Sequence, residues 1–157
     1  MKVAGSLPCG SIMVQASKKG EPFMLMNVCA VAAGGALGAV CRYLTGVAVG
    51  KLGPAASVLG GFPLATFLAN IAGCFLIGVL SVAFASEWGQ ARGTWKLFAI
   101  TGIMGGFTTF STFSLETVML AQDGAWGMTV LNIVLSLAAC LVGVVLGRLA
   151  AQAFVAA

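Results

Sequence analysis

The residues with the clearest potential for chemistry are crowded into one apolar stretch, Gly102 to Glu116. The stretch contains GIMGGFTTFSTFSLE, in which three glycines precede hydroxyl side chains interleaved with phenylalanines. Glycine and hydroxylic or β-branched residues are weak helix formers, so this composition weakens a helix. The stretch lies within a hydrophobic run, residues 95–121, that is long enough to cross a bilayer.

A helix broken at mid-membrane would leave backbone groups without partners. Each such group costs several kcal/mol unless protein or water satisfies it. A break therefore implies a lined cavity or a bound ion. The alternative is a glycine-kinked packing helix whose hydroxyls bond back to its own carbonyls. The stretch taken alone leaves both interpretations open.

The composition sets the class of protein. The chain has 157 residues, of which 60% are hydrophobic and 8% charged, which indicates an integral membrane protein. It has no histidine and four acidic residues, which excludes histidine triads and argues against a catalytic carboxylate pair. The net charge of +4 is too thinly spread for a nucleic-acid surface. We expect neither an enzyme nor a nucleic-acid partner.

Four apolar runs predict an all-α membrane protein with four transmembrane helices. We expect this channel-sized domain to cover residues 24–150, after a disordered tail at 1–23 and before a short C-terminal tail at 151–157. A G-x-x-x-G pair, Gly34 and Gly38, predicts close helix packing in the first span. The predicted spans are 24–41, 62–85, 95–121 and 126–149.

Two of the spans carry isolated polar side chains. Asn70 is the one strongly polar residue of the second span, so it must face other helices or a pore. The last span has polar residues at spacings of three, four and four, which place them on one helix face. Such a stripe serves either as interhelical hydrogen bonding or as a ladder of donors for an anion. Its members are Thr129, Asn132, Ser136 and Cys140.

The string GGFTTFSTFSLE resembles the signature of the Fluc/CrcB family of fluoride channels. Similar segments follow the family order: GGALGAVCRY, ATFLANIAGCFLIG and the polar-striped last span, together covering residues 25–149. The resemblance implies passive fluoride export through two pathways in an antiparallel homodimer of the bacterial inner membrane. Four spans in a single copy cannot wall a pore on every side, which agrees with a dimer.

The resemblance also implies a set of pathway residues. The matching asparagine, Asn70, lines the fluoride path, and its amide offers two donors to an anion. Phe110 and Phe113 match paired pore rings, whose edges carry partial positive charge. Either ring could instead be ordinary core packing. The remaining donors expected along the pathway are Thr109, Thr112, Asn132 and Ser136.

Three further roles are expected, of which the sodium site follows from the resemblance. Carbonyls of Gly105 and Thr108, contributed by both copies, would hold a structural sodium ion, since oxygen ligands favour a hard cation. Arg42 is either an interfacial anchor or a fixed charge that attracts anions to the pore mouth. Glu116 is either a proton relay or a carboxylate that supports helix packing.

Charge in the loops bears on orientation. Counted from Met24, three cationic residues lie on the side of the termini and two on the other, which suits oppositely inserted copies. Lysines in residues 1–23 raise the count to six against two. We therefore expect either a start at Met24 or Met26, or a tail too weak to fix one orientation.

The competing function is that of a proton-coupled exporter similar to the small four-helix multidrug transporters. Those proteins centre on a glutamate in the first helix. The first span predicted here has none.

Overall fold

The computed structural model describes residues 21–52, 61–85 and 92–156, and those residues form helices joined by short connections. Four helical segments are long and apolar enough to cross a membrane. They span Phe23–Gly50, Leu64–Ala83, Gly93–Gln122 and Trp126–Val155. The prediction of an all-helical protein with four such segments is confirmed. Residues 1–20 of the expected tail lie outside the described part of the chain.

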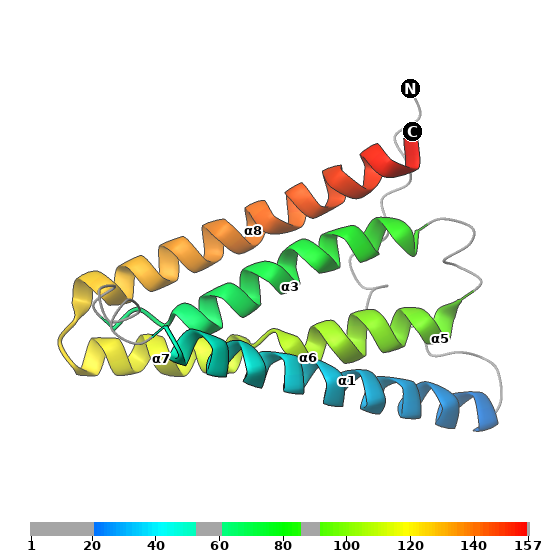
Figure 1. Ribbon diagram of the computed structural model, residues 1–157, viewed down its shortest axis with the longest axis horizontal. Coiled ribbons are helices and arrows are strands. Elements are labelled where there is room, and N and C mark those ends of the chain that lie inside the picture. Colours follow the sequence, from blue (N-terminus) through cyan, green and yellow to red (C-terminus); the bar gives the residue numbers. More distant parts are fainter. Residues whose placement is uncertain (1–20, 53–60, 86–91, 157) are drawn as a thin grey trace.

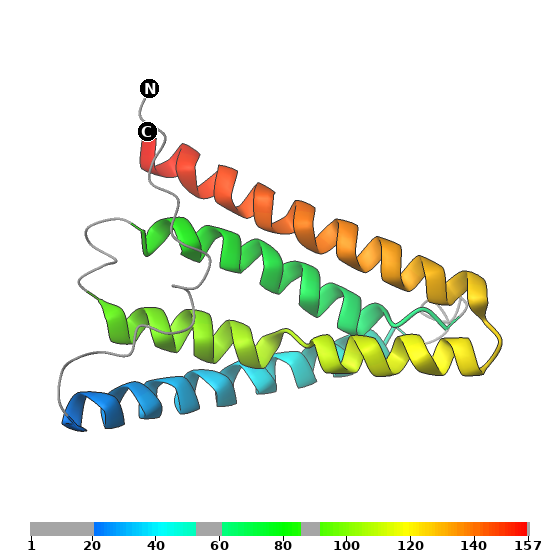
Figure 2. The ribbon, with the colours of Figure 1, turned by 180° about the vertical axis from the view of Figure 1, so that it is seen from behind.

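The segments associate as two pairs, visible from both sides of the molecule (Figures 1 and 2). One pair is α1 (Glu21–Gly50) with the first half of the third segment. The other is α3 (Leu64–Ala83) with α8 (Trp126–Ala156). The starts of α1 and α5 and the C-terminal end of α8 lie at one end of the bundle, and the connection between α7 and α8 lies at the other.

Glycines allow the two helices of each pair to approach until their backbones are in contact. A Cβ added at Gly34 would collide with the Phe98 carbonyl, and one at Gly38 with the Ile103 carbonyl. The predicted packing role of Gly34 and Gly38 is thereby confirmed. On the other pair, a Cβ at Gly147 would collide with the Phe75 carbonyl. Because these contacts meet backbone, a larger side chain would force the helices apart.

The third segment changes its helical form along its length. It starts as α5 (Gly93–Lys96), continues as the π-helix η1 (Leu97–Met104) and ends its first half in α6 (Gly105–Phe107). Two residues then adopt extended backbone: Thr108 with ψ 155° and Thr109 with ψ 114°. Helix α7 (Phe110–Gln122) follows. The sequence did not indicate the π-helix, a form that is rare and often found at functional sites.

The first and last helices are longer than the apolar runs that predicted them. Helix α1 continues past Arg42 to Gly50, and α8 continues to Ala156. Hydropathy marks only the part of a helix that suits lipid, and neither extension contains a proline that would end the helix. The turn between α7 and α8 contains Gly124 at φ 76°, a conformation that favours glycine.

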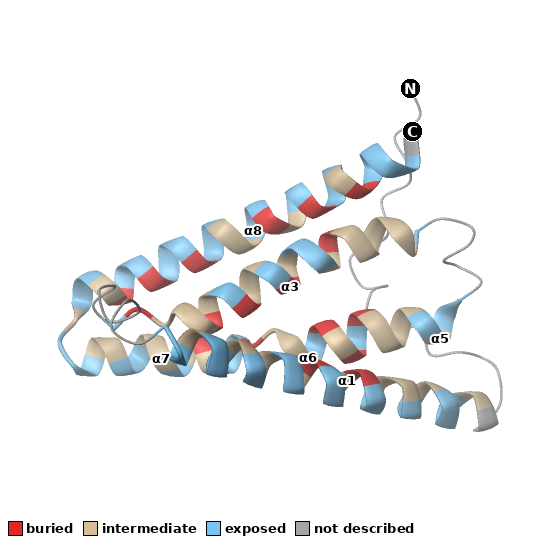
Figure 3. Ribbon diagram, in the orientation of Figure 1, coloured by how far each residue is buried: buried red, intermediate tan, exposed pale blue. Residues whose placement is uncertain are grey.

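Most of the apolar surface faces outward in a single copy. In an apolar stretch of 18 residues in each span, between 11% and 22% of the residues are buried. The buried residues lie mainly where the helices face one another (Figure 3). A surface of this kind requires lipid or another protein chain around it.

Candidate functional site

The amide of Asn70 on α3 pairs with the backbone of Thr109. Its Nδ2 donates to the Thr109 carbonyl at 3.1 Å, and its Oδ1 accepts from the Thr109 N–H at 2.8 Å. The side chain thus satisfies both backbone groups of an extended residue, as a neighbouring strand would do. One N–H of the amide remains for another acceptor.

This pairing removes a helical partner from the Gly105 carbonyl. In a continuous α-helix the Thr109 N–H would bond to that carbonyl, but here it donates to Asn70. The Thr108 carbonyl loses its partner in the same way, because the Thr112 N–H donates to Thr109 Oγ1 at 3.1 Å. The two carbonyls expected to hold a cation are therefore two whose usual donors have been diverted. Gly105 itself is exposed.

The hydroxyl of Thr109 forms the centre of a small cluster. It caps the N-terminus of α7 by accepting from Thr112, and it donates to Thr112 Oγ1 at 3.0 Å. Ser111 Oγ lies 3.1 Å from the same oxygen. The cap explains why α7 can begin directly after two extended residues. The structure brings Thr109 and Thr112 together, as the pathway hypothesis requires of neighbouring donors.

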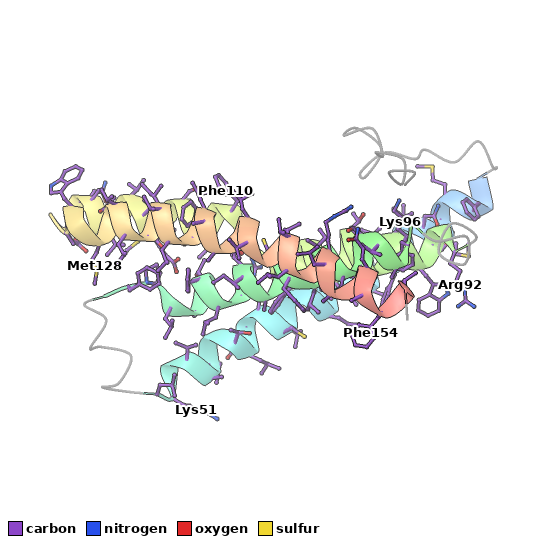
Figure 4. All side chains as sticks on the ribbon, turned by 90° about the horizontal axis from the view of Figure 1, so that it is seen from above. Lys51, Arg92, Lys96, Phe110, Met128 and Phe154 are labelled. Atoms are coloured by element: carbon purple, nitrogen blue, oxygen red, sulfur yellow. The ribbon has the colours of Figure 1, made fainter. Side chains whose placement is uncertain are left out.

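The paired phenylalanines occupy different environments. Their ring centroids are 5.5 Å apart with planes inclined by 43°. Phe113 is 9% exposed, whereas Phe110 is 74% exposed and projects from the bundle (Figure 4). Within one copy, Phe113 is therefore a packed ring and Phe110 is not.

Glu116 is held by Thr66, a residue that the sequence did not single out. Thr66 Oγ1 donates to Glu116 Oε1 at 2.9 Å, and Oε2 is buried with no hydrogen-bond partner among the described residues. Thr66 lies one helical turn before Asn70, so a single face of α3 meets α7 twice. That spacing was the available signal for Thr66.

Three members of the predicted polar stripe on α8, Thr129, Asn132 and Ser136, are buried, and Asn132 bonds to a neighbouring helix. Asn132 is 1% exposed, and its Nδ2 donates to Thr117 Oγ1 on α7 at 2.8 Å. Ser136 Oγ donates to Asn132 Oδ1 at 3.2 Å. Further along α8, the thiol of Cys140 lies next to the thiol of Cys74 on α3. Thr117 was missed because a threonine in an apolar helix has no distinguishing pattern in sequence.

Arg42 stands apart from these groups. It is half-buried on α1, and within the described part of the chain its guanidinium makes no hydrogen bond or ion pair. Its charge is therefore not neutralised by a neighbour there. The other half of the bundle has an arginine as well, Arg148, which donates to Ser81 Oγ at 3.0 Å.

Together these contacts define a helical membrane protein with its polar side chains gathered on α7 and on the faces of α3 and α8 that meet it. Residues 29–148 match the model of the family described as CrcB-like protein, Camphor Resistance (CrcB). The chain belongs to this family.

Curated relatives named fluoride-specific ion channel FluC match most of the chain. The protein of Ruminiclostridium cellulolyticum is 50% identical over 128 residues, which are 82% of this chain and 94% of the relative. That of Elusimicrobium minutum is 45% identical, over 78% and 90% of the two chains. That of Sulfurovum sp. is 40% identical, over 82% and 94%. The family is thus one of ion channels and not of enzymes.

Proposed function

We propose that this protein is a fluoride-selective channel that lets fluoride leave the cell passively and so lowers its cytoplasmic concentration. The observation that supports it most is the Asn70–Thr109 pairing, because it holds two extended residues open beside donors and aromatic rings. The relatives named as fluoride-specific channels supply the identity of the ion. As a passive pathway it would need no energy source of its own.

The pathway we infer runs along α7. Fluoride is small and strongly hydrated, so each position must replace lost water with close donors. The remaining N–H of Asn70 and the hydroxyl of Thr112, which accepts from Thr109, have hydrogens to offer. The hydroxyls of Thr109 and Ser136 donate to Thr112 and Asn132, so each would have to turn its hydrogen toward a passing anion. Phe110 and Phe113 would meet the anion with their positively polarised edges. Arg42 would raise the anion concentration at the mouth.

We infer that the chain works as an antiparallel homodimer with two pathways. Phe110 is 74% exposed in one copy, which suits a ring completed by a partner. From Met24 on, cationic residues are nearly balanced between the ends of the bundle: Arg92 and Lys96 lie at one end and Lys51 at the other (Figure 4). Arg148 bonds to Ser81 near the C-terminal end of α3 and adds to the first group, while Arg42 of α1 precedes Lys51 and adds to the second. Such balance permits insertion in both orientations. Compartment reporters on the C-terminus, with and without residues 1–23, test it; a single orientation in a conducting protein would exclude this dimer.

A structural sodium ion at the dimer axis is the cofactor we propose. The carbonyls of Gly105 and Thr108 fit it, since the N–H groups that would otherwise bond to them donate elsewhere. Gly105 is exposed and has open space beside it, so a second copy could approach and double the oxygen ligands. Oxygen ligands from carbonyls suit a hard cation.

The function is tested in a bacterium that lacks its own fluoride exporter and therefore stops growing in fluoride. We expect this chain, placed in the inner membrane, to restore growth, and the Asn70→Asp variant, at equal abundance, not to. A proton-coupled exporter is distinguished in liposomes. A passive channel releases fluoride only when valinomycin lets potassium carry compensating charge, whatever the pH gradient. Release driven by a pH gradient alone would favour the exporter.

A further inference from the structure

Helix α7 carries both phenylalanines but is weakly attached to its own chain. The extended residues Thr108 and Thr109 interrupt the helical hydrogen bonds that would otherwise fix its rotation relative to α6. The contact between α7 and α8 is also far smaller than the contact between α3 and α8. Its rotation must therefore depend on side-chain bonds to the frame that α3 and α8 form together.

Three such contacts are present among the described residues. Two come from α3: Asn70 exchanges two hydrogen bonds with Thr109, and Thr66 donates one to Glu116. The third is the bond from Asn132 of α8 to Thr117. Only this third bond holds α7 from the side of α8.

Asn132 is linked to the backbone of Phe113 through the hydroxyl of Thr117. Thr117 Oγ1 has one hydrogen, which it donates to the Phe113 carbonyl at 2.6 Å, so it accepts from Asn132 Nδ2. Ser136 donates to the other end of the amide, at Oδ1. The direction of every bond in the chain Ser136–Asn132–Thr117–Phe113 is thereby assigned, and it ends on the backbone of the packed ring.

We propose that Asn132 and Thr117 are positioning residues that fix the rotation of α7 and, through it, the place of the Phe113 ring. This inference rests on the proposed fluoride function. Asn132 is 1% exposed, with its oxygen and one N–H already bonded within the protein, so its main task is to hold Thr117. In the proposed role Thr117 does not bind the ion and affects transport only by positioning Phe113.

A double-mutant cycle tests the proposal. The variants are Asn132→Leu, Thr117→Val and the two combined, and the measurements are fluoride and chloride efflux from liposomes. Residues that act through one shared contact lose it only once, so we expect each single variant to lose about tenfold in fluoride rate and the double variant to lose no more. Chloride leakage should rise in all three as the ring loses its place.

Thr117→Ser keeps the hydroxyl and should restore the fluoride rate to within about twofold of the wild type, because the bond from Asn132 survives. Thr45→Val is the matched control: Thr45 also donates to the carbonyl four residues earlier, on Cys41 at 2.9 Å, but in the described part of the chain it receives no bond from another helix. It should conduct normally. Normal fluoride selectivity and rate in Thr117→Val would overturn the proposal and leave Asn132 as a direct donor. Equal loss in Thr117→Val and Thr117→Ser would also overturn it. If the wild type itself released no fluoride, the proposed function would fail instead.

Discussion

Asn70 and Thr109 are joined by two hydrogen bonds that run in opposite directions, 2.8 Å and 3.1 Å long. One side chain thus replaces both partners that Thr109 would have had in a continuous helix. The pairing makes two extended residues tolerable inside an apolar segment, where an unsatisfied backbone group costs several kcal/mol. It also frees the Gly105 carbonyl, so one asparagine links the proposed anion pathway to the proposed cation site.

The first prediction concerns this asparagine. Asn70→Asp keeps the size and the acceptor but removes the donor to the Thr109 carbonyl and adds a negative charge. We expect at least a tenfold loss of fluoride efflux, since an unsatisfied buried carbonyl costs about 1–3 kcal/mol. Asn27→Asp is the matched control: within the described ranges Asn27 donates no hydrogen bond, and its Oδ1 accepts one from Thr94 at 2.9 Å. Asn70→Asp conducting as well as Asn27→Asp would place Asn70 outside the pathway.

The second prediction separates the two rings. Phe110→Ile and Phe113→Ile each remove an aromatic edge, so both should reduce fluoride efflux. Phe113 is buried, so its variant should also lose roughly 1 kcal/mol of unfolding free energy, whereas the exposed Phe110 should not affect the stability of the protomer. Phe154→Ile, at an 87% exposed position near the end of α8, is the control. Normal flux in both pathway variants would make the rings simple packing groups.

The third prediction concerns the space beside Thr108. A Cβ added at Gly73 would collide with Thr108 Cγ2, so Gly73→Ala should displace the extended residues, at a cost of about 1–3 kcal/mol in stability, and reduce fluoride efflux. Adding Thr108→Ser removes the methyl group and keeps the hydroxyl, so the double variant should recover both stability and flux.

Gly46→Ala is the control for that pair of variants, since nothing lies within 4 Å of its added Cβ. There alanine should stabilise the helix by up to about 1 kcal/mol. Thermal unfolding in detergent and efflux from liposomes measure both effects. Failure of Thr108→Ser to rescue Gly73→Ala would show that the collision is not what disturbs the site.

The fourth prediction concerns sodium. An ion that binds only the folded dimer stabilises it by about 2.7 kcal/mol at a hundred times its dissociation constant. Replacing potassium by sodium at constant ionic strength should therefore raise the melting temperature by several degrees. Choline in place of potassium controls for ionic strength alone. Equal melting temperatures in sodium and potassium would exclude a selective sodium site.

The sequence predicted the four apolar segments well because lipid imposes a long hydrophobic run on each. It also pointed to Asn70 and to the glycine–threonine stretch, since both are anomalous in such a run. It could not show that Asn70 bonds to Thr109, because the contact joins residues far apart in the chain. Thr117 was missed because threonine is ordinary in a membrane helix until its partner is known. Thr66 was missed although its spacing of one helical turn from Asn70 was a signal.

The helix ends and the π-helix were less accessible to prediction. Hydropathy gave Cys41 as the end of the first span, while the helix runs to Gly50 because no residue in between breaks it. The π-helix at Leu97–Met104 lies at backbone distance from α1, which approaches it at Gly34 and Gly38. That packing is a tertiary property, and the local sequence LFAITGIM does not encode it alone.

The most direct test of the central claim is the release of fluoride from liposomes that contain the purified chain. The vesicles are loaded with equal concentrations of fluoride and chloride. Valinomycin then lets potassium carry the compensating charge, and ion-selective electrodes follow each anion. We predict rapid release of nearly all the fluoride from protein-containing vesicles while chloride stays inside. Fluoride release no faster than from protein-free vesicles, or equal release of both anions, would contradict a fluoride-selective channel.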